Sequence, residues 1–158
     1  MSPDIQLDTT QGRPVRLSDH RGKALAIFYE AKGHHDDNAA LKDACARLVE
    51  RGGLDGRFDV LGVADLDGLG FGPVKAMVKR AVTAVAKGYG VSLAMDFAGA
   101  LEARLGLAGG GSTVALLDPS GAVVFNRSGR LDARDADDFF AALGDALGRR
   151  RDSLPNAA

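Results

Sequence analysis

The chain has 158 residues, 46% apolar and 26% charged, a composition typical of a globular domain and not of a disordered polypeptide. Its formal net charge is −1, and aromatic residues make up only 6% with no tryptophan, so neither a nucleic acid nor a membrane is expected as a partner. A lone cysteine, Cys45, excludes an internal disulfide framework and any cysteine-rich zinc motif.

The N-terminal stretch "MSPDIQLDTTQG" carries no signal-peptide pattern. No apolar run reaches the roughly 20 residues that cross a bilayer. These features predict a cytoplasmic protein. We expect one domain over residues 1–148 and a polar, flexible tail over 149–158.

The first half of the chain predicts a β-hairpin, a buried strand and an amphipathic helix. Leu7 and Val15 lie on either side of the turn signal "TTQG", which predicts the hairpin. The run "ALAIFYE" over 24–30 is typical of a strand covered on both faces. After Asp37, apolar residues recur every three or four positions, which predicts a helix that ends at "RGG".

The second half begins with another apolar strand, "FDVLGVADL", and a helix that starts near Pro73. The expected apolar face of this helix comprises Val74, Met77, Val78, Ala81, Val82 and Val85, and its expected solvated face carries Lys75, Lys79, Arg80 and Lys87. A short helix over "DFAGALEARLGL", a hairpin around the turn "PSG" and the amphipathic helix "DARDADDFFAALGDALG" follow. This order predicts an α/β fold with a central mixed sheet flanked by helices.

Two segments, "PVRLSDHRGKALAIFY" and "STVALLDPSGAVVFNRSG", resemble the thioredoxin superfamily. The resemblance is stronger to its redoxin branch, which includes alkyl hydroperoxide reductase-like and peroxiredoxin-like proteins. It extends over residues 3–147 as an order of elements with two moderately specific motifs. It implies a thioredoxin-like fold with an N-terminal β-hairpin and, in active members, thiol oxidoreductase or antioxidant activity.

The chain departs from this family where the family keeps its thiols. A thioredoxin-type C-x-x-C would fall on Gly33 to Asp36, and a peroxiredoxin-type cysteine would fall near Asp37, but neither place has sulfur. The family also implies a cis-proline before the late strand, where this chain has Ser112, so we expect a trans peptide there. Cysteine-poor YtfJ-like redoxins show a similar loss.

The favoured hypothesis is a binding or regulatory module that is not an enzyme and has no cofactor. It would use the former catalytic edge of the sheet, where ligands of open α/β folds usually bind, to hold a protein partner or small ligand. We call this the vestigial active-site edge, and its predicted residues are Glu30, Gly33, His34, His35, Asp36, Asp37, Asp65, Ser112 and Thr113.

Other hypotheses stay open. One hypothesis is a metal-dependent activity, because the imidazole and carboxylate side chains of His34, His35 and Asp36 are of the kind that bind metals. Their spacing matches no established metal motif. The alternative is a polar loop in which Asp36 or Asp37 is the N-cap of the following helix. Cys45 would be the thiol of a thioredoxin- or peroxiredoxin-type oxidoreductase, although its apolar neighbours favour a structural role. A structural or oligomerising subunit is the remaining class. The glycine-rich loops "GLGFGP" and "GGGST" miss the nucleotide-binding spacings.

Overall fold

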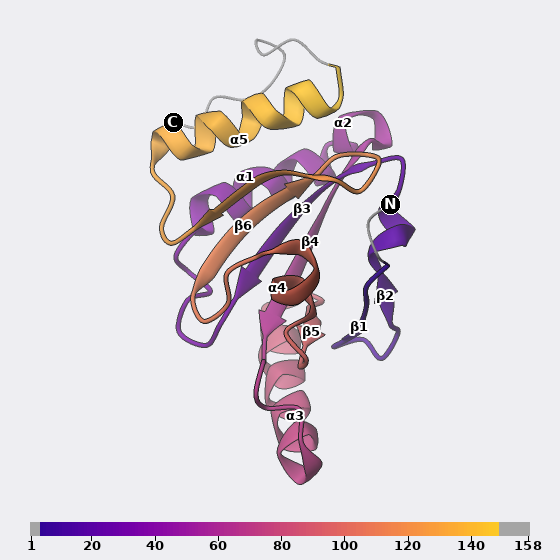
Figure 1. The fold of residues 1–158 in the computed structure, drawn as a ribbon, viewed down its shortest axis with the longest axis vertical. Helices are drawn as coiled ribbons and strands as arrows, with labels where there is room; N and C mark the ends of the chain where they lie inside the picture. The colour runs from indigo at the N-terminus through magenta and orange to yellow at the C-terminus, as the bar shows by residue number, and fades with distance from the viewer. Residues whose placement is uncertain (1–3, 149–158) are drawn as a thin grey trace.

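A computed structural model describes residues 4–148, which form a seven-stranded mixed sheet with helices on both faces (Figure 1). The strands are β1 (Gln6–Thr9), β2 (Val15–Arg16), β3 (Ala24–Glu30), β4 (Phe58–Asp65), β5 (Ala94–Asp96), β6 (Ser112–Leu117) and β7 (Val123–Ser128). Their order across the sheet is β2-β1-β5-β4-β3-β6-β7. The pairs β3–β4 and β4–β5 are parallel, and the other neighbouring pairs are antiparallel.

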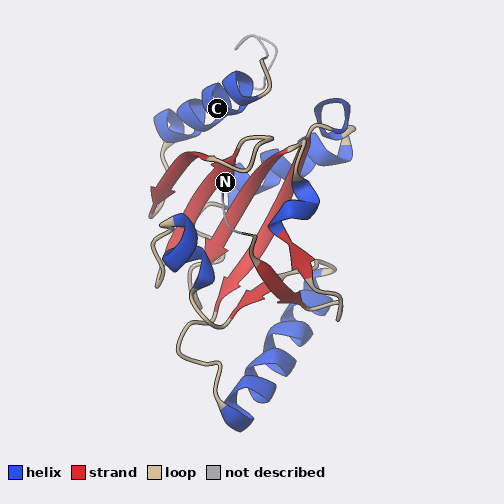
Figure 2. Cartoon of the chain, turned by 45° about the vertical axis from the view of Figure 1, so that its right-hand side comes forward, coloured by secondary structure: helices blue, strands red, loops and turns tan. Residues whose placement is uncertain are grey.

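The helices occupy the connections between these strands. They are the 3-10 helix η1 (Leu17–His20) and the α-helices α1 (Ala39–Glu50), α2 (Gly53–Gly56), α3 (Gly72–Tyr89), α4 (Ala100–Leu105) and α5 (Ala133–Ala146). Helices α1 and α5 cover one face of the sheet, and α4 covers the other together with the N-terminal segment. Helix α3 extends away from the sheet in both Figure 1 and Figure 2.

Strand β3 is buried on both faces, so its side chains alternate between two apolar cores. Even-numbered residues 24–28 face the core that α1 and α5 close, where Phe139 is fully buried. Odd-numbered residues 25–29 face the second core, where Leu101 of α4 is fully buried. The uninterrupted apolar run of β3 is therefore explained by its central place in the sheet.

The structure confirms the predicted mixed sheet, its flanking helices and the N-terminal hairpin, in which Leu7 pairs with Val15. It also confirms the late β6–β7 hairpin, whose turn closes when Gly121 N–H donates to Asp118 C=O at 2.9 Å. Strand β5 was not predicted, because three residues are too few to show a period. The predicted tail, 149–158, lies outside the described residues.

The predicted orientation of α3 is right only in part: Val74, Val78 and Val82 are half-buried as expected, but the buried side is rotated from the predicted one. Met77 and Val85 are 66% and 56% exposed, whereas the solvated face expected for the lysines is partly turned inward. Lys79 forms an ion pair with Asp8 at 3.1 Å, and the Lys75 ammonium lies 5.2 Å from the centre of the Phe97 ring. Apolar residues occupy so much of the helix circumference that sequence spacing alone could not select the buried side.

Candidate functional site

The vestigial active-site edge forms where β3 ends beside the start of β6. Glu30, the last residue of β3, pairs in register with Ser112, and Thr113 follows on the same strand. Just beyond β3, Ala31 N–H donates to Gly111 C=O at 2.7 Å. This bond holds the glycine-rich loop before β6 against the turn after β3.

A pocket of about 140 Å³ opens at this edge. It is bounded by the turn after β3, the loop before β6 and the end of β7. Its lining residues are His34, Asp37, Ala108, Gly109, Gly111, Ser112, Thr113, Ser128 and Gly129. Because a water molecule occupies about 30 Å³ of liquid, the pocket has the size for a small polar molecule or for one side chain of a partner.

The His34 imidazole and the Asp37 carboxylate lie together on one wall of this pocket. His34 Nδ1 lies 2.8 Å from Asp37 Oδ2, and Arg130 Nε lies 3.5 Å from Asp37 Oδ1. The hydrogen bond with His34 lowers the pKa of Asp37, and the nearby Arg130 charge acts in the same direction. Asp37 is thus held as a carboxylate, with its oxygens directed at these two partners.

The hydroxyl groups of the pocket are already engaged in hydrogen bonds. Thr113 Oγ1 donates to Ala108 C=O at 2.8 Å, so the 2.9 Å contact between Thr113 and Ser128 uses the proton of Ser128. Ser112 Oγ accepts a hydrogen bond from Asn38 Nδ2 at 3.0 Å. These contacts stabilise the wall of the pocket, and none of them pairs a hydroxyl with His34 as an activating base.

Sequence reasoning missed Asn38, which joins three segments of the site. Its side chain, 4% exposed, donates from Nδ2 to Ser112 Oγ and to Gly129 C=O, both at 3.0 Å, and Oδ1 accepts from Leu131 N–H at 2.8 Å. Asn38 also occupies the N-cap position of α1 without a side-chain cap bond, so the predicted N-cap role of Asp36 or Asp37 is wrong. Only its place directly after "HHDD" could have drawn attention to it.

A second polar cluster lies behind the loop before β6. Tyr29 Oη is 3.1 Å from Asp65 Oδ1 and 3.2 Å from Asp96 Oδ2, and Gly110 N–H donates to Asp65 Oδ2 at 2.7 Å. Burial, followed by the charges of Asp96 and Asp65, raises the pKa of Tyr29, so its hydroxyl stays protonated and can donate. Asp65 therefore stabilises the loop and does not line the pocket.

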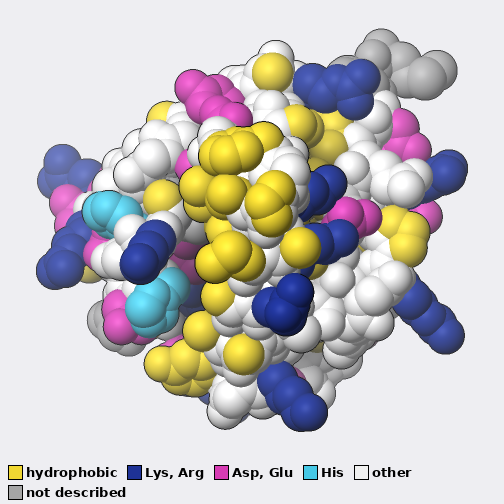
Figure 3. All heavy atoms as spheres, turned by 90° about the horizontal axis from the view of Figure 1, so that it is seen from below, with side chains coloured by type: hydrophobic (Ala, Val, Ile, Leu, Met, Phe, Trp, Pro, Cys, Tyr) yellow, Lys and Arg dark blue, Asp and Glu magenta, His cyan; other side chains and the backbone are white. Residues whose placement is uncertain are grey.

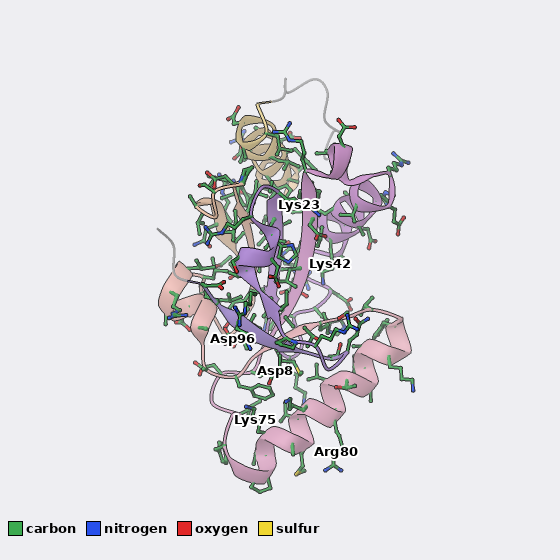
Figure 4. The ribbon with its side chains drawn as sticks, turned by 90° about the vertical axis from the view of Figure 1, so that its right-hand side faces the viewer. Asp8, Lys23, Lys42, Lys75, Arg80 and Asp96 are labelled. Atoms are coloured by element: carbon green, nitrogen blue, oxygen red, sulfur yellow. The ribbon has the colours of Figure 1, made fainter. Side chains whose placement is uncertain are left out.

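Glu30 also lies outside the pocket, on the inner side of the turn. Lys42 Nζ donates to Glu30 Oε1 at 2.6 Å and to His35 C=O at 2.9 Å, which ties α1 to the turn (Lys42 is labelled in Figure 4). Burial raises the pKa of Glu30, while its hydrogen bond with Lys42 acts in the opposite direction. Glu30 therefore positions the turn that carries His34.

The remaining residues of "GHHDD" do not line the pocket. The side chains of His35 and Asp36 are 62% and 86% exposed, and His35 Nε2 lies 3.4 Å from Asp36 Oδ2. Gly33 has a φ of +86°, a left-handed conformation that favours glycine. Within residues 4–148, no three histidine, cysteine or carboxylate side chains are grouped as a metal site requires. The predicted ligand set of His34, His35 and Asp36 is therefore not assembled.

Cys45 is fully buried in the core between α1 and the sheet. Burial raises the pKa of its thiol to about 12. A thiolate is the nucleophilic form of cysteine, so this environment suppresses its reactivity near neutral pH. The peptide bonds within residues 4–148 are all trans, the bond that precedes Ser112 included.

The arrangement of strands and helices defines a thioredoxin-like fold, and solved structures agree with it. The pneumococcal exposed lipoprotein thioredoxin Etrx1 of Streptococcus pneumoniae matches at a TM-score of 0.66 and 23% identity, over 90% of this chain and 99% of the other. A secreted thiol-disulfide isomerase of Corynebacterium glutamicum matches at a TM-score of 0.67 and 15% identity, over 94% and 86% of the two chains.

A thiol:disulfide interchange protein of the thioredoxin family from Chlorobium tepidum matches at a TM-score of 0.61 and 18% identity, over 93% of this chain and 95% of the other. Neither a scan against protein-family models nor a search of curated proteins found a match. The chain is thus a cysteine-poor protein with a thioredoxin-like fold, similar in structure to thiol:disulfide interchange proteins. Its assignment to the redoxin branch stays a prediction.

Proposed function

We propose that this protein is a binding module that does not exchange disulfides, and that its pocket at the vestigial active-site edge receives a side chain from an extended segment of a partner protein. The observation that carries the proposal is the separation of the thiol from the edge. Cys45 is fully buried and has a raised pKa, whereas the pocket is lined by His34, Asp37, three hydroxyl residues, Ala108 and three glycines.

The conformation of the turn supports this proposal. Gly33 takes the first place of the family's C-x-x-C motif, and its left-handed φ of +86° is one that a cysteine adopts only with strain. Asp36 takes the last place and is exposed outside the pocket. The turn is therefore built for its present residues and differs from a thioredoxin turn by more than the loss of two sulfur atoms.

The chemistry of the pocket indicates what it would bind. Backbone groups of Gly109, Gly111 and Gly129 leave its walls free of bulky side chains, and His34 offers a ring nitrogen beside them. These groups suit hydrogen bonds to a polar side chain or to an exposed peptide backbone. The rigid contacts of Asn38 with Ser112 and Gly129 keep the pocket open before a partner arrives.

Amide NMR titration with reduced, carboxymethylated α-lactalbumin, an unfolded polypeptide whose thiols are blocked, tests this proposal. We expect shift changes centred on Gly111, Ser112 and Gly129. Replacing His34 with alanine should weaken the binding about fivefold, the effect of losing one hydrogen bond.

The matched control is His35→Ala, which removes the neighbouring imidazole outside the pocket and should leave the affinity unchanged. Absence of any shift change at these amides would contradict the proposal, as would equal weakening by the two histidine variants.

A further inference from the structure

Helix α3 and the loops at its ends expose an apolar surface that the proposed function does not use. Phe71, Met77 and Tyr89 are 61%, 66% and 71% exposed. We define the α3 face as the exposed large apolar side chains of this segment: Leu69, Phe71, Met77, Val85, Tyr89 and Val91. Figure 3, which views the molecule from the end where α3 projects, shows apolar side chains gathered in a central band. Continuous exposed apolar surface of this kind marks a site of interaction.

Cations border the α3 face. Arg80 and Lys87 are exposed and lie seven residues apart, on one flank of the helix. Figure 4 shows Lys75 on the side of α3 toward the sheet and Arg80 on the outer side. Residues 72–89 contain no acidic side chain, so the exposed charges on the helix itself, those of Arg80 and Lys87, are positive. A complementary surface must therefore be anionic.

A second copy of this chain fits the α3 face poorly. In an antiparallel helix pair related by a two-fold axis, each flank of one helix lies against the same flank of the other. Depending on the register, Arg80 would then approach either Arg80 or Lys87 of the second copy, and these like charges repel. The exposed apolar residues also continue beyond both helix ends, at Phe71 and Val91, which suits a broad planar surface better than a single helical groove.

We propose that the α3 face binds an anionic membrane surface. The apolar side chains would enter the boundary between lipid headgroups and acyl chains, while Arg80 and Lys87 contact lipid phosphates. Among residues 4–148, α3 included, no helix has the length and apolarity needed to cross a bilayer, so the contact would be peripheral. The net charge of −1 argued against a membrane partner. That value sums over the whole chain, so it does not show that the positive charges on α3 are balanced by acidic residues elsewhere.

Cosedimentation of the full chain with lipid vesicles tests the proposal. We expect binding to vesicles of 70% phosphatidylcholine and 30% phosphatidylglycerol and none to pure phosphatidylcholine. Raising the salt to 0.5 M should weaken binding about tenfold. Met77→Ser/Tyr89→Ser and Arg80→Glu/Lys87→Glu should each reduce the partition coefficient at least about tenfold. Because these side chains are exposed, we expect the variants to fold, and their thermal melting verifies this.

The control variant Lys23→Glu/Arg134→Glu makes the same change in net charge at exposed sites away from α3 and should bind as the wild type does. Failure to bind the anionic vesicles would overturn the proposal. Equal loss in this control would also overturn it, because binding would then depend on net charge alone. A dimer that Met77→Ser/Tyr89→Ser dissociates, together with no vesicle binding, would assign the α3 face to a second copy.

Discussion

Replacing Asn38 with alanine is expected to lower the free energy of unfolding by about 3 kcal/mol, as measured by urea denaturation. The buried side chain makes three hydrogen bonds, to Ser112, Gly129 and Leu131, which connect the start of α1 to both ends of the β6–β7 hairpin. Alanine would leave Gly129 C=O and Leu131 N–H without these partners, and an unpaired buried polar group is costly. The pocket should lose its shape as well as its stability.

Two control substitutions isolate this effect. Asn126→Ala removes an exposed asparagine with a single 3.2 Å hydrogen bond to Gly106 C=O and should cost less than about 1 kcal/mol. Asn38→Asp keeps the acceptor for Leu131 N–H but removes both donated bonds, so it should also lower the free energy of unfolding by more than Asn126→Ala does. A loss in Asn38→Ala no greater than in Asn126→Ala would show that Asn38 does not hold the segments together.

Replacing Asp96 with alanine is expected to have the second large effect, about 4 kcal/mol of unfolding free energy. Asp96 is 1% exposed, and its carboxylate accepts hydrogen bonds from Ala100 N–H at 2.9 Å and Leu101 N–H at 3.0 Å. It also lies 3.2 Å from the Tyr29 hydroxyl. The substitution would therefore detach the start of α4 from β5 and leave the Tyr29 hydroxyl to donate to Asp65.

The comparison for this substitution is Asp132→Ala at the start of α5. Asp132 also accepts a backbone hydrogen bond, from Asp135 N–H at 2.8 Å, but it is exposed, so its loss should cost about 1 kcal/mol. The loss of unfolding free energy in Tyr29→Phe should lie between those of Asp96→Ala and Asp132→Ala, because this variant removes the hydroxyl donor but keeps both carboxylates. If Asp96→Ala and Asp132→Ala destabilise equally in urea denaturation, burial of the Asp96 carboxylate contributes nothing, contrary to this account.

The sequence predicted the elements whose signals are local. The six consecutive apolar residues of β3 and the Asp118 turn between β6 and β7 carry strong patterns, and both elements are found where they were expected. Strand β5 has three residues and is defined by its pairing with β1 and β4, which no local pattern records. The buried side of α3 is set by tertiary contacts, so spacing alone placed Val74, Val78 and Val82 correctly but not Met77, Ala81 and Val85.

The site was predicted in part, for a similar reason. The thioredoxin resemblance located the edge, and the structure places His34, Asp37, Ser112 and Thr113 together in the pocket. The "HHDD" motif does not act as one unit, because the turn directs His34 and Asp37 inward while their two neighbours face solvent. Asn38 contacts residues 74 to 93 positions away in the sequence, and one sequence holds no record of such long-range contacts.

The absence of thiol chemistry at the vestigial active-site edge is the central claim, and insulin reduction tests it most directly. Dithiothreitol reduces the interchain disulfides of insulin, and a thioredoxin-type catalyst accelerates the resulting turbidity. We predict that the wild type and Cys45→Ala both match dithiothreitol alone, because Cys45 is buried with a pKa of about 12. Acceleration by the wild type that Cys45→Ala abolishes would contradict the claim and make Cys45 a working thiol.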